Sequence, residues 1–204
     1  NFNSNLVSAQ NRARFYVTNI PNIEVPKELS SIMVKDILDK EKTNEKIYHL
    51  SKEHEKENPK MTKTGMMKIG DLDGKNSQGY RVYSINGKSS TLCSASGGVG
   101  AKTGLYKMNN GDVRKLTISE ARRLQTIPDW VEIPVSDAQA YKQLGNGWTV
   151  EVIKSFLKNI PNIENEEILV LSMYDGMGCG YITLKALNCN IKEYISVEID
   201  KYCQ

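Results

Sequence analysis

ILVLSMYDGMGCGYITLKAL, residues 168–187, joins an apolar run, a glycine-rich turn and a segment with helical character. ILVLSMY has the length and composition of a buried strand, DGMGCG is typical of a turn, and YITLKAL favours a helix. A second apolar run, YISVEI at residues 194–199, follows and has the composition of a strand. A strand, a turn, a helix and a second strand make the β-turn-α-β unit of doubly wound sheets. The expected fold class is therefore α/β.

The glycine-rich turn lies where such units bind ligands. Backbone without side chains can approach a ligand closely, and the following helix directs free N–H groups towards it. Glu198 ends the next strand, about twenty residues further on, where a carboxylate can bind ribose hydroxyls. Gly176, Gly178 and Gly180 depart from the Gly-x-Gly-x-x-Gly spacing of dinucleotide sites. From the residues alone, a purely structural turn stays open as the alternative.

Three helices are expected before this unit. Thr117 and Glu120 form a Thr-x-x-Glu capping box, which predicts the start of the first helix. Asp137 is expected to cap a second short helix that stops at Gly145. A third helix is expected over residues 150–158, because its apolar residues form one stripe.

The N-terminal part has β character between stretches of loop. Gln10, Arg12 and Arg14 alternate ahead of RFYVTNI, so on a strand they would share one face; a solvated edge strand would also explain them. Residues 35–63 are dense in charge and are expected to form a solvated helix or loop. Residues 79–104 contain the short β-type segments RVYSI and STLCSA between glycines, which indicates a small β-rich unit.

Composition narrows the class of protein but not its function. The 204 residues are 39% hydrophobic and 25% charged, with a net charge of +3, as in many soluble globular proteins. The four cysteines occur singly, which is typical of reduced thiols in a cytosolic protein. No apolar run approaches the roughly 18 residues of a membrane span. His49 and His54 lack neighbouring Cys or further His residues, so no metal site is expected.

Four strings resemble motifs of the DNA cytosine-5 methyltransferases. QNRAR (10–14), RKLTISEARRLQTIPD (114–129) and AYKQLGNGWTVEVI (140–153) are similar, in that order, to C-terminal motifs of the family. VLSMYDGMGCGYITLKAL with YISVEIDKY is similar to the S-adenosylmethionine loop of phage and bacterial members, yet it follows the other strings instead of leading them. The resemblance implies a Rossmann-like methyltransferase sheet with a smaller β-rich target-recognition domain.

The same resemblance divides the chain and assigns its cofactor residues. It implies a catalytic-domain strand (1–22), a target-recognition domain (23–113), closing motifs with a returning helix (114–160), and a linker with the cofactor unit (161–204). The glycine-rich turn would hold the methionine part of the cofactor and the acidic residue its ribose. The implied cofactor residues are Tyr174, Asp175, Gly176, Gly178, Gly180, Glu198, Ile199, Asn146 and Trp148. Many family members carry a small residue where this chain has Trp148.

Double-stranded DNA is the implied substrate. In the family, an Arg at the position of Arg14 contacts the flipped cytosine; Arg12 and Gln10 share its active-site strand, and a guanidinium can donate to a base carbonyl. SQGYRVYSINGKSSTLCSASGGVGAKTG (77–104) is similar to recognition domains that read short GC-rich sites, although an ordinary glycine-rich β unit stays open. The implied DNA-binding residues are Gln78, Arg81, Thr91, Gly97, Gly98, Lys102 and Thr103. Gln78 would fill the hole left by the extruded base, and Arg81 would pair with guanine.

Two catalytic strings of the family do not occur in these 204 residues. The family's nucleophilic cysteine lies in Pro-Cys and its acid in Glu-Asn-Val; Cys203 follows Tyr202 and is not a candidate. We therefore expect that this chain alone cannot methylate DNA. Either the gene is circularly permuted or a second chain or missing segment supplies these motifs; the order of the strings favours permutation or a junction between tandem copies.

The leading hypothesis is a cytosine-5 methyltransferase of a restriction-modification system or phage, acting in the cytoplasm. It would transfer methyl from S-adenosyl-L-methionine to C5 of a flipped cytosine. One alternative is a non-catalytic DNA-recognition or regulatory subunit of a split methyltransferase. A tRNA cytosine methyltransferase shares the motifs, but the long recognition segment argues against it.

Overall fold

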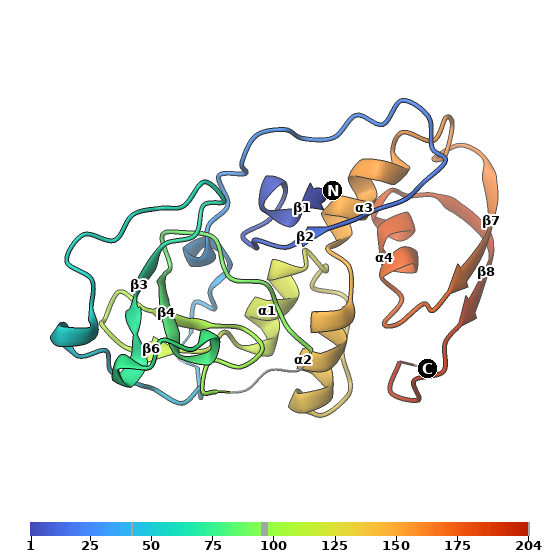
Figure 1. Cartoon of the computed structure of the whole chain (residues 1–204). Coiled ribbons are helices and arrows are strands. Elements are labelled where there is room, and N and C mark those ends of the chain that lie inside the picture. Colours follow the sequence, from blue (N-terminus) through green and yellow to red (C-terminus); the bar gives the residue numbers. More distant parts are fainter. Residues whose placement is uncertain (42, 95–97, 204) are drawn as a thin grey trace.

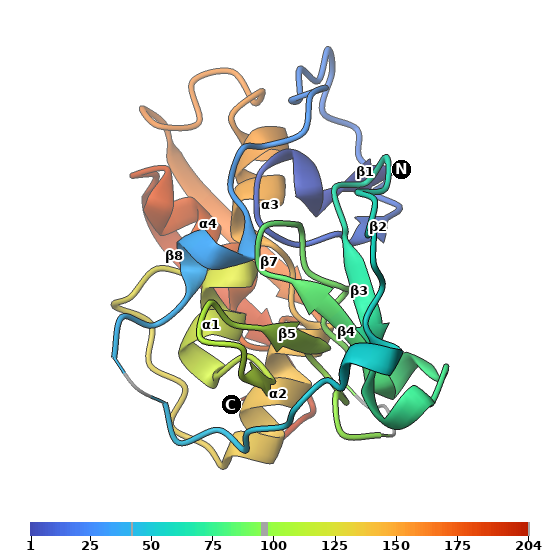
Figure 2. The ribbon, with the colours of Figure 1, turned by 90° about the vertical axis from the view of Figure 1, so that its left-hand side faces the viewer.

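Helices at the centre of the molecule separate two unlike β structures. The computed structural model describes residues 1–41, 43–94 and 98–203. In Figure 1 a four-stranded sheet lies on one side of α1, α2 and α3, and a two-stranded sheet with α4 lies on the other. Figure 2, viewed from the side of the larger sheet, shows β7 and β8 behind the helices. The helices are α1 (Ile118–Leu124), α2 (Asp137–Asn146), α3 (Val150–Leu157) and α4 (Cys179–Ala186). None in the described part of the chain has both the length and the apolar character that crossing a membrane requires.

The C-terminal unit has the predicted β-turn-α-β form. β7 (Glu167–Met173) and β8 (Asn190–Val197) pair in parallel, and α4 connects them. Ile168 and Val170 of β7 and Ile191 and Tyr194 of β8 pack against apolar residues of α3 and α4. These helices therefore cover one face of the strand pair. Helix α4 begins two residues before the expected YITLKAL segment. The mixed α/β class expected from the sequence is confirmed.

The opposite face of β7 and β8 carries exposed apolar side chains. These residues are 43–69% exposed: Leu169, Leu171, Met173, Ile195 and Val197. Parallel strands are normally buried on both faces, because helices cover each side of the sheet. This face therefore resembles sheet interior more than protein surface.

The capping box of α1 continues into a buried ion pair. Thr117 Oγ1 accepts from the Glu120 N–H, and Glu120 accepts from the Thr117 N–H, as predicted. The Glu120 carboxylate is fully buried and receives both terminal nitrogens of Arg114 at 2.7 Å. It also accepts from the backbone N–H of Asp39. Glu120 therefore does more than the predicted capping, because its carboxylate is also the buried counter-charge of Arg114.

Helix α2 differs from expectation at both ends. Ser136 occupies the N-cap position, and Asp137 is the first helical residue instead of the cap. The helix continues to Asn146, one residue beyond the predicted stop. Gly145 lies inside the helix, and the position requires glycine because a Cβ there would be 2.4 Å from the Ser94 backbone nitrogen. Its role is a close approach between backbones, which the sequence does not reveal.

The described residues up to Arg114 form two small sheets. β3 (Lys68–Asp71), β4 (Arg81–Ser84), β5 (Leu105–Lys107) and β6 (Val113–Arg114) form a sheet in that order, with β4 and β5 parallel and the other pairs antiparallel. β1 (Phe2–Asn3) pairs with β2 (Ala13–Arg14). Residues 35–63 contain no α-helix among those described, and short 3-10 turns interrupt an irregular path.

Two predicted strands are wrong. RVYSI is confirmed as β4, but STLCSA forms no strand over residues 90–94, and Ala95 lies outside the described residues. RFYVTNI forms a strand at Arg14 alone; beyond it, Phe15 is 85% and Val17 100% exposed. The described partner of this strand, β1, is two residues long, so the ladder has nothing to pair with beyond Arg14. The residues after Arg14 have high β propensity, but without a strand to pair with they do not form one.

The buried ion pair predicts a large asymmetry between two Glu→Gln substitutions. Glu120→Gln should lower the free energy of unfolding by about 3–5 kcal/mol, because it leaves the Arg114 guanidinium buried without its counter-charge. Glu167→Gln is the matched control, since the Glu167–Lys192 pair is largely exposed and is worth about 1 kcal/mol or less. Urea denaturation followed by circular dichroism measures both. Equal, small losses would show that Glu120 acts as an ordinary helix cap.

Candidate functional site

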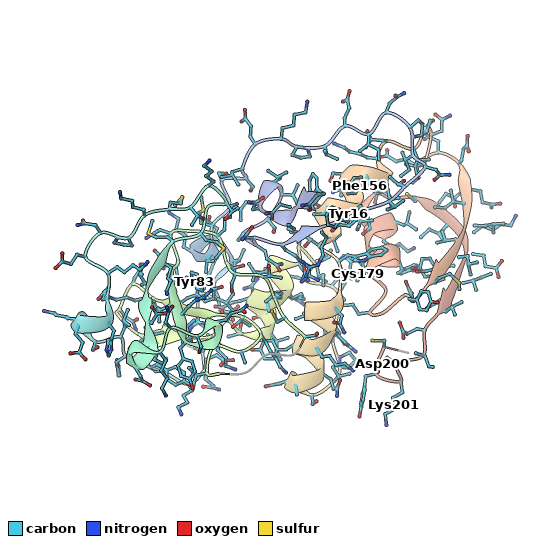
Figure 3. The ribbon with its side chains drawn as sticks, viewed as in Figure 1. Tyr16, Tyr83, Phe156, Cys179, Asp200 and Lys201 are labelled. Carbon is cyan, nitrogen blue, oxygen red and sulfur yellow. The ribbon has the colours of Figure 1, made fainter. Side chains whose placement is uncertain are left out.

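A single pocket joins two segments that are far apart in the sequence. The turn after α2 and the turn after β7 both line it, as do residues after β8. The lining residues are Lys142, Gln143, Asn146, Gly147, Trp148, Ser172, Met173, Tyr174, Asp175, Gly176, Met177, Cys179, Glu198, Asp200 and Cys203. In Figure 3, Cys179 at the start of α4 and Asp200 after β8 lie beside α2.

The two turns touch at Gly147. A Cβ at this position would lie 3.3 Å from both Met177 Sδ and Cys179 Sγ, which is tighter than ordinary contact. Lys142 forms an ion pair with Asp200 at 3.0 Å, and the Gln143 amide donates to the Tyr202 carbonyl. The end of α2 therefore holds both the glycine-rich turn and the segment after β8.

Two carboxylates shape the glycine-rich turn. Asp175 accepts hydrogen bonds from the hydroxyls of Ser172 and Tyr194, which fixes its side chain. Glu198 accepts from the backbone N–H groups of Asp200, Gly176 and Ile199, each at 2.7 Å. These hydrogen bonds, that from Asp200 first, lower the pKa of Glu198. The end of β8 is thus bonded directly to the turn and carries a negative charge at neutral pH.

The pocket contains six of the nine expected cofactor residues. Trp148 is 49% and Tyr174 87% exposed, so both rings have solvent-accessible faces at the pocket. Gly178, Gly180 and Ile199 do not line it: Gly178 is the left-handed N-cap residue of α4, with φ of 73°. A Cβ at Gly180 would meet the Tyr194 hydroxyl at 3.0 Å. These two glycines shape the turn behind the pocket surface.

Sequence reasoning missed several lining residues. Lys142 and Gln143 are one helical turn before Asn146, and helical spacing from that motif could have found them. Asp200 follows Glu198 by two residues, and its ion pair with Lys142 and the hydrogen bond from its N–H to Glu198 hold it at the pocket. Met177 and Cys179 lie between the glycines of the turn, and no pattern in the sequence singles them out.

The cysteines at the pocket are not activated thiols. Burial raises the pKa of Cys179 to about 11, and burial also raises the pKa of Cys203. A nucleophilic cysteine needs a lowered pKa, because the thiolate is the reactive form. No group of three potential ligand side chains is placed to hold a metal ion within the described residues.

Gln10, Arg12 and Arg14 occupy three different environments. Gln10 is fully buried, and its amide donates to Gln125 Oε1 at 3.2 Å. Arg12 is 5% exposed and donates only to backbone carbonyls among the partners described. Arg14 is exposed, and its guanidinium donates to the adjacent Ala13 carbonyl. Of the three, Arg14 is the one whose side chain is accessible to solvent.

Part of the expected DNA-binding set lines a second pocket beside β4. Gln78, Thr91, Gly98 and Lys102 come together there, with the glycines and serines around them. Gly98 has φ of 89°, and a Cβ there would be 2.9 Å from Gly79 Cα. Backbone conformation and packing against Gly79 therefore already require glycine at this position.

The other expected DNA-binding residues lie apart from that pocket. Thr103 is fully buried, and its hydroxyl donates to the Gly104 carbonyl and accepts from the Leu116 N–H. Arg81 lies on β4 outside the lining, and Gly97 falls outside the described residues.

Comparison with known proteins places this architecture in a family. A family model for C-5 cytosine-specific DNA methylases matches residues 4–162. The chain is 34% identical over 168 residues to Type II methyltransferase M.HhaI of Haemophilus parahaemolyticus, covering 74% of this chain and 48% of that protein. It is 30% identical over 173 residues to M.HpaII of Haemophilus parainfluenzae, covering 74% and 46%. The chain thus spans about half the length of these relatives. It belongs to the C-5 cytosine-specific DNA methylase family.

Proposed function

We propose that this chain forms the cofactor-binding and DNA-recognition parts of a DNA cytosine-5 methyltransferase. The observation that carries the proposal is the convergence of the Asn146 turn and the glycine-rich turn on one pocket. Membership of the methylase family supports the reaction class. The proposed reaction moves a methyl group to C5 of a cytosine extruded from duplex DNA.

The pocket offers hydrogen-bonding groups and aromatic rings that suit the ribose and adenine of S-adenosyl-L-methionine. The Glu198 carboxylate, held in place by three backbone N–H groups, would accept hydrogen bonds from ribose hydroxyls. Trp148 and Tyr174 offer aromatic surface for the adenine, and the N-terminal end of α4 faces the same pocket through Cys179. When bound, the cofactor supplies an electrophilic methyl group on a sulfonium. The chain's own residues bind and orient it.

Gly147→Ala should weaken binding of S-adenosylmethionine about tenfold, equivalent to about 1.4 kcal/mol. The new methyl group would push Met177 and Cys179 away from the end of α2, while the backbone φ of −62° accepts alanine. Isothermal titration calorimetry measures the affinity, and the fluorescence of Trp148 offers a second signal.

Gly111→Ala is the control for that experiment. Gly111 lies in an open turn with φ of 90°, so alanine there strains the backbone without touching the pocket. It should lower stability and leave cofactor affinity unchanged. A wild-type chain that does not bind the cofactor would overturn the proposed function, whereas unchanged affinity of Gly147→Ala would overturn only the role of this contact.

The region from residue 23 to 113 is proposed as the target-recognition domain, with a short GC-rich duplex site as its ligand. The clustering of Gln78, Thr91 and Lys102 beside β4 supports this assignment. Gln78 and Arg81 would reach base edges in the major groove, and Lys102 would contact phosphate. Arg14, on β2, would contact the extruded cytosine.

Lys102→Gln should weaken binding to all duplexes by a similar factor and reduce the slope of log affinity against log salt by about 1, because one phosphate contact is lost. Lys192→Gln, on β8, removes the same charge away from this region and should change neither quantity. Fluorescence anisotropy with duplex DNA and with tRNA measures both. Preference for tRNA would favour the tRNA methyltransferase alternative, and equal effects of the two variants would refute the assignment of Lys102.

The Pro-Cys and Glu-Asn-Val segments are proposed to come from further polypeptide, either in the same protein or in a second chain. The exposed apolar face of β7 and β8 supports this, because a parallel sheet is stable when both faces are covered. The polypeptide that carries the catalytic strings would pack on that face. A chain that binds DNA and cofactor but never acquires these strings would be the non-catalytic alternative.

The 204-residue chain alone should therefore transfer no methyl group to DNA. The measurement is incorporation of labelled methyl from S-adenosylmethionine into a cytosine-containing duplex. Activity should appear when a polypeptide carrying both strings is supplied. Robust turnover by the isolated chain would contradict this prediction.

A further inference from the structure

The last turn of α2 is in contact with the cofactor side and the recognition side of the molecule. On one side, Gly145 approaches the backbone of Cys93 and Ser94 so closely that a Cβ would lie 2.4–2.5 Å from it. On the other side, Gly147 abuts Met177 and Cys179 of the cofactor turn. A shift of this turn therefore moves both neighbours, because packed interiors transmit displacement.

Arg12 forms hydrogen bonds that link the last turn of α2 to Leu92. Its guanidinium donates to the carbonyls of Leu92 at 3.0 Å, Gly145 at 2.9 Å and Gly147 at 3.1 Å. No ion pair with a carboxylate is formed by Arg12 within the described ranges. Burial lowers its pKa to about 10, so it remains charged at neutral pH. Its positive charge is balanced by carbonyl dipoles at the C-terminal end of α2.

A second path joins the same two points. The Leu92 N–H donates to Gln10 Oε1 at 3.0 Å, and Gln10 donates to Gln125 at 3.2 Å. Gln125 in turn donates to the Gly147 carbonyl at 3.2 Å. Both backbone groups of Leu92 are therefore linked to Gly147, one through Arg12 and the other through two buried glutamines. Such duplication fixes the distance between the recognition segment and the cofactor turn.

We propose that Arg12 is a positioning residue that couples the two sites, so that cofactor and DNA each strengthen binding of the other. This rests on the proposed function. A ligand in the cofactor pocket would hold the Gly147–Trp148 turn, and Arg12 would pass that order to Leu92 and the adjoining Thr91. Because such coupling is reciprocal, DNA must raise cofactor affinity by the same factor.

The test is a thermodynamic cycle with S-adenosylhomocysteine, which cannot donate a methyl group, and a cytosine-containing duplex. For the wild-type chain, each ligand should raise the affinity for the other at least about fivefold. In Arg12→Met the factor should fall to about one. Arg12→Lys should restore part of it, because an ammonium reaches fewer of the carbonyls. Calorimetry and anisotropy measure the affinities, and circular dichroism confirms folding.

Arg122→Met is the matched control. Arg122 donates to two backbone carbonyls, those of Asp129 and Val131, and also pairs with the Asp129 carboxylate, but it lines neither pocket. It should keep the wild-type coupling factor whatever it does to stability. If Arg12→Met does not fold, Arg12→Lys and Gln125→Met carry the test, the latter by cutting the second path.

The outcomes separate the inference from the function on which it rests. A wild-type chain that binds neither ligand overturns the proposed function. A wild-type chain that binds both without coupling overturns the inference alone. An Arg12→Met chain that binds both with the wild-type factor shows that Arg12 is only a structural residue, since such a role changes stability without changing the ratio of affinities.

Discussion

The close approach of Gly147 to Met177 and Cys179 is the constraint on which the arrangement depends. It sets α2 against the β7–α4–β8 unit at a distance where a Cβ at Gly147 would force both sulfur atoms to shift by a few tenths of an ångström. The ion pair between Lys142 and Asp200 and the bond from Gln143 to Tyr202 then hold the segment after β8 against the same helix. The pocket exists because these contacts bring two chain segments to a shared surface.

Local patterns predicted the elements well where the interactions that define them are local. The β-turn-α-β unit depends on apolar runs and a glycine-rich turn, all within about thirty residues, and its order and pairing were predicted correctly. The capping box at Thr117 closes within a single turn of helix and was also correct. The convergence at the pocket was predicted only through resemblance, since nothing in the residues around Asn146 indicates which segment they meet.

Predictions failed where distant partners decide the outcome. The segment after Arg14 has strand composition, but among the described residues β1 is its strand partner and β1 ends at Asn3, so the segment stays irregular. Glu120 was predicted only as a capping residue, because its buried partner Arg114 comes from β6 and not from the helix. Gly145 looked like a helix stop, whereas its reason lies in the backbone of Cys93 and Ser94. In each case the deciding contact involves a residue on another element, so local sequence patterns do not predict it.

The bare apolar side of β7 and β8 has a consequence for how this polypeptide survives in a cell. Within the described residues no third strand pairs with β7 or β8, and water-exposed leucine, methionine, isoleucine and valine on such a strand pair form the kind of surface that aggregates or recruits chaperones. The chain on its own is therefore prone to self-association through this face.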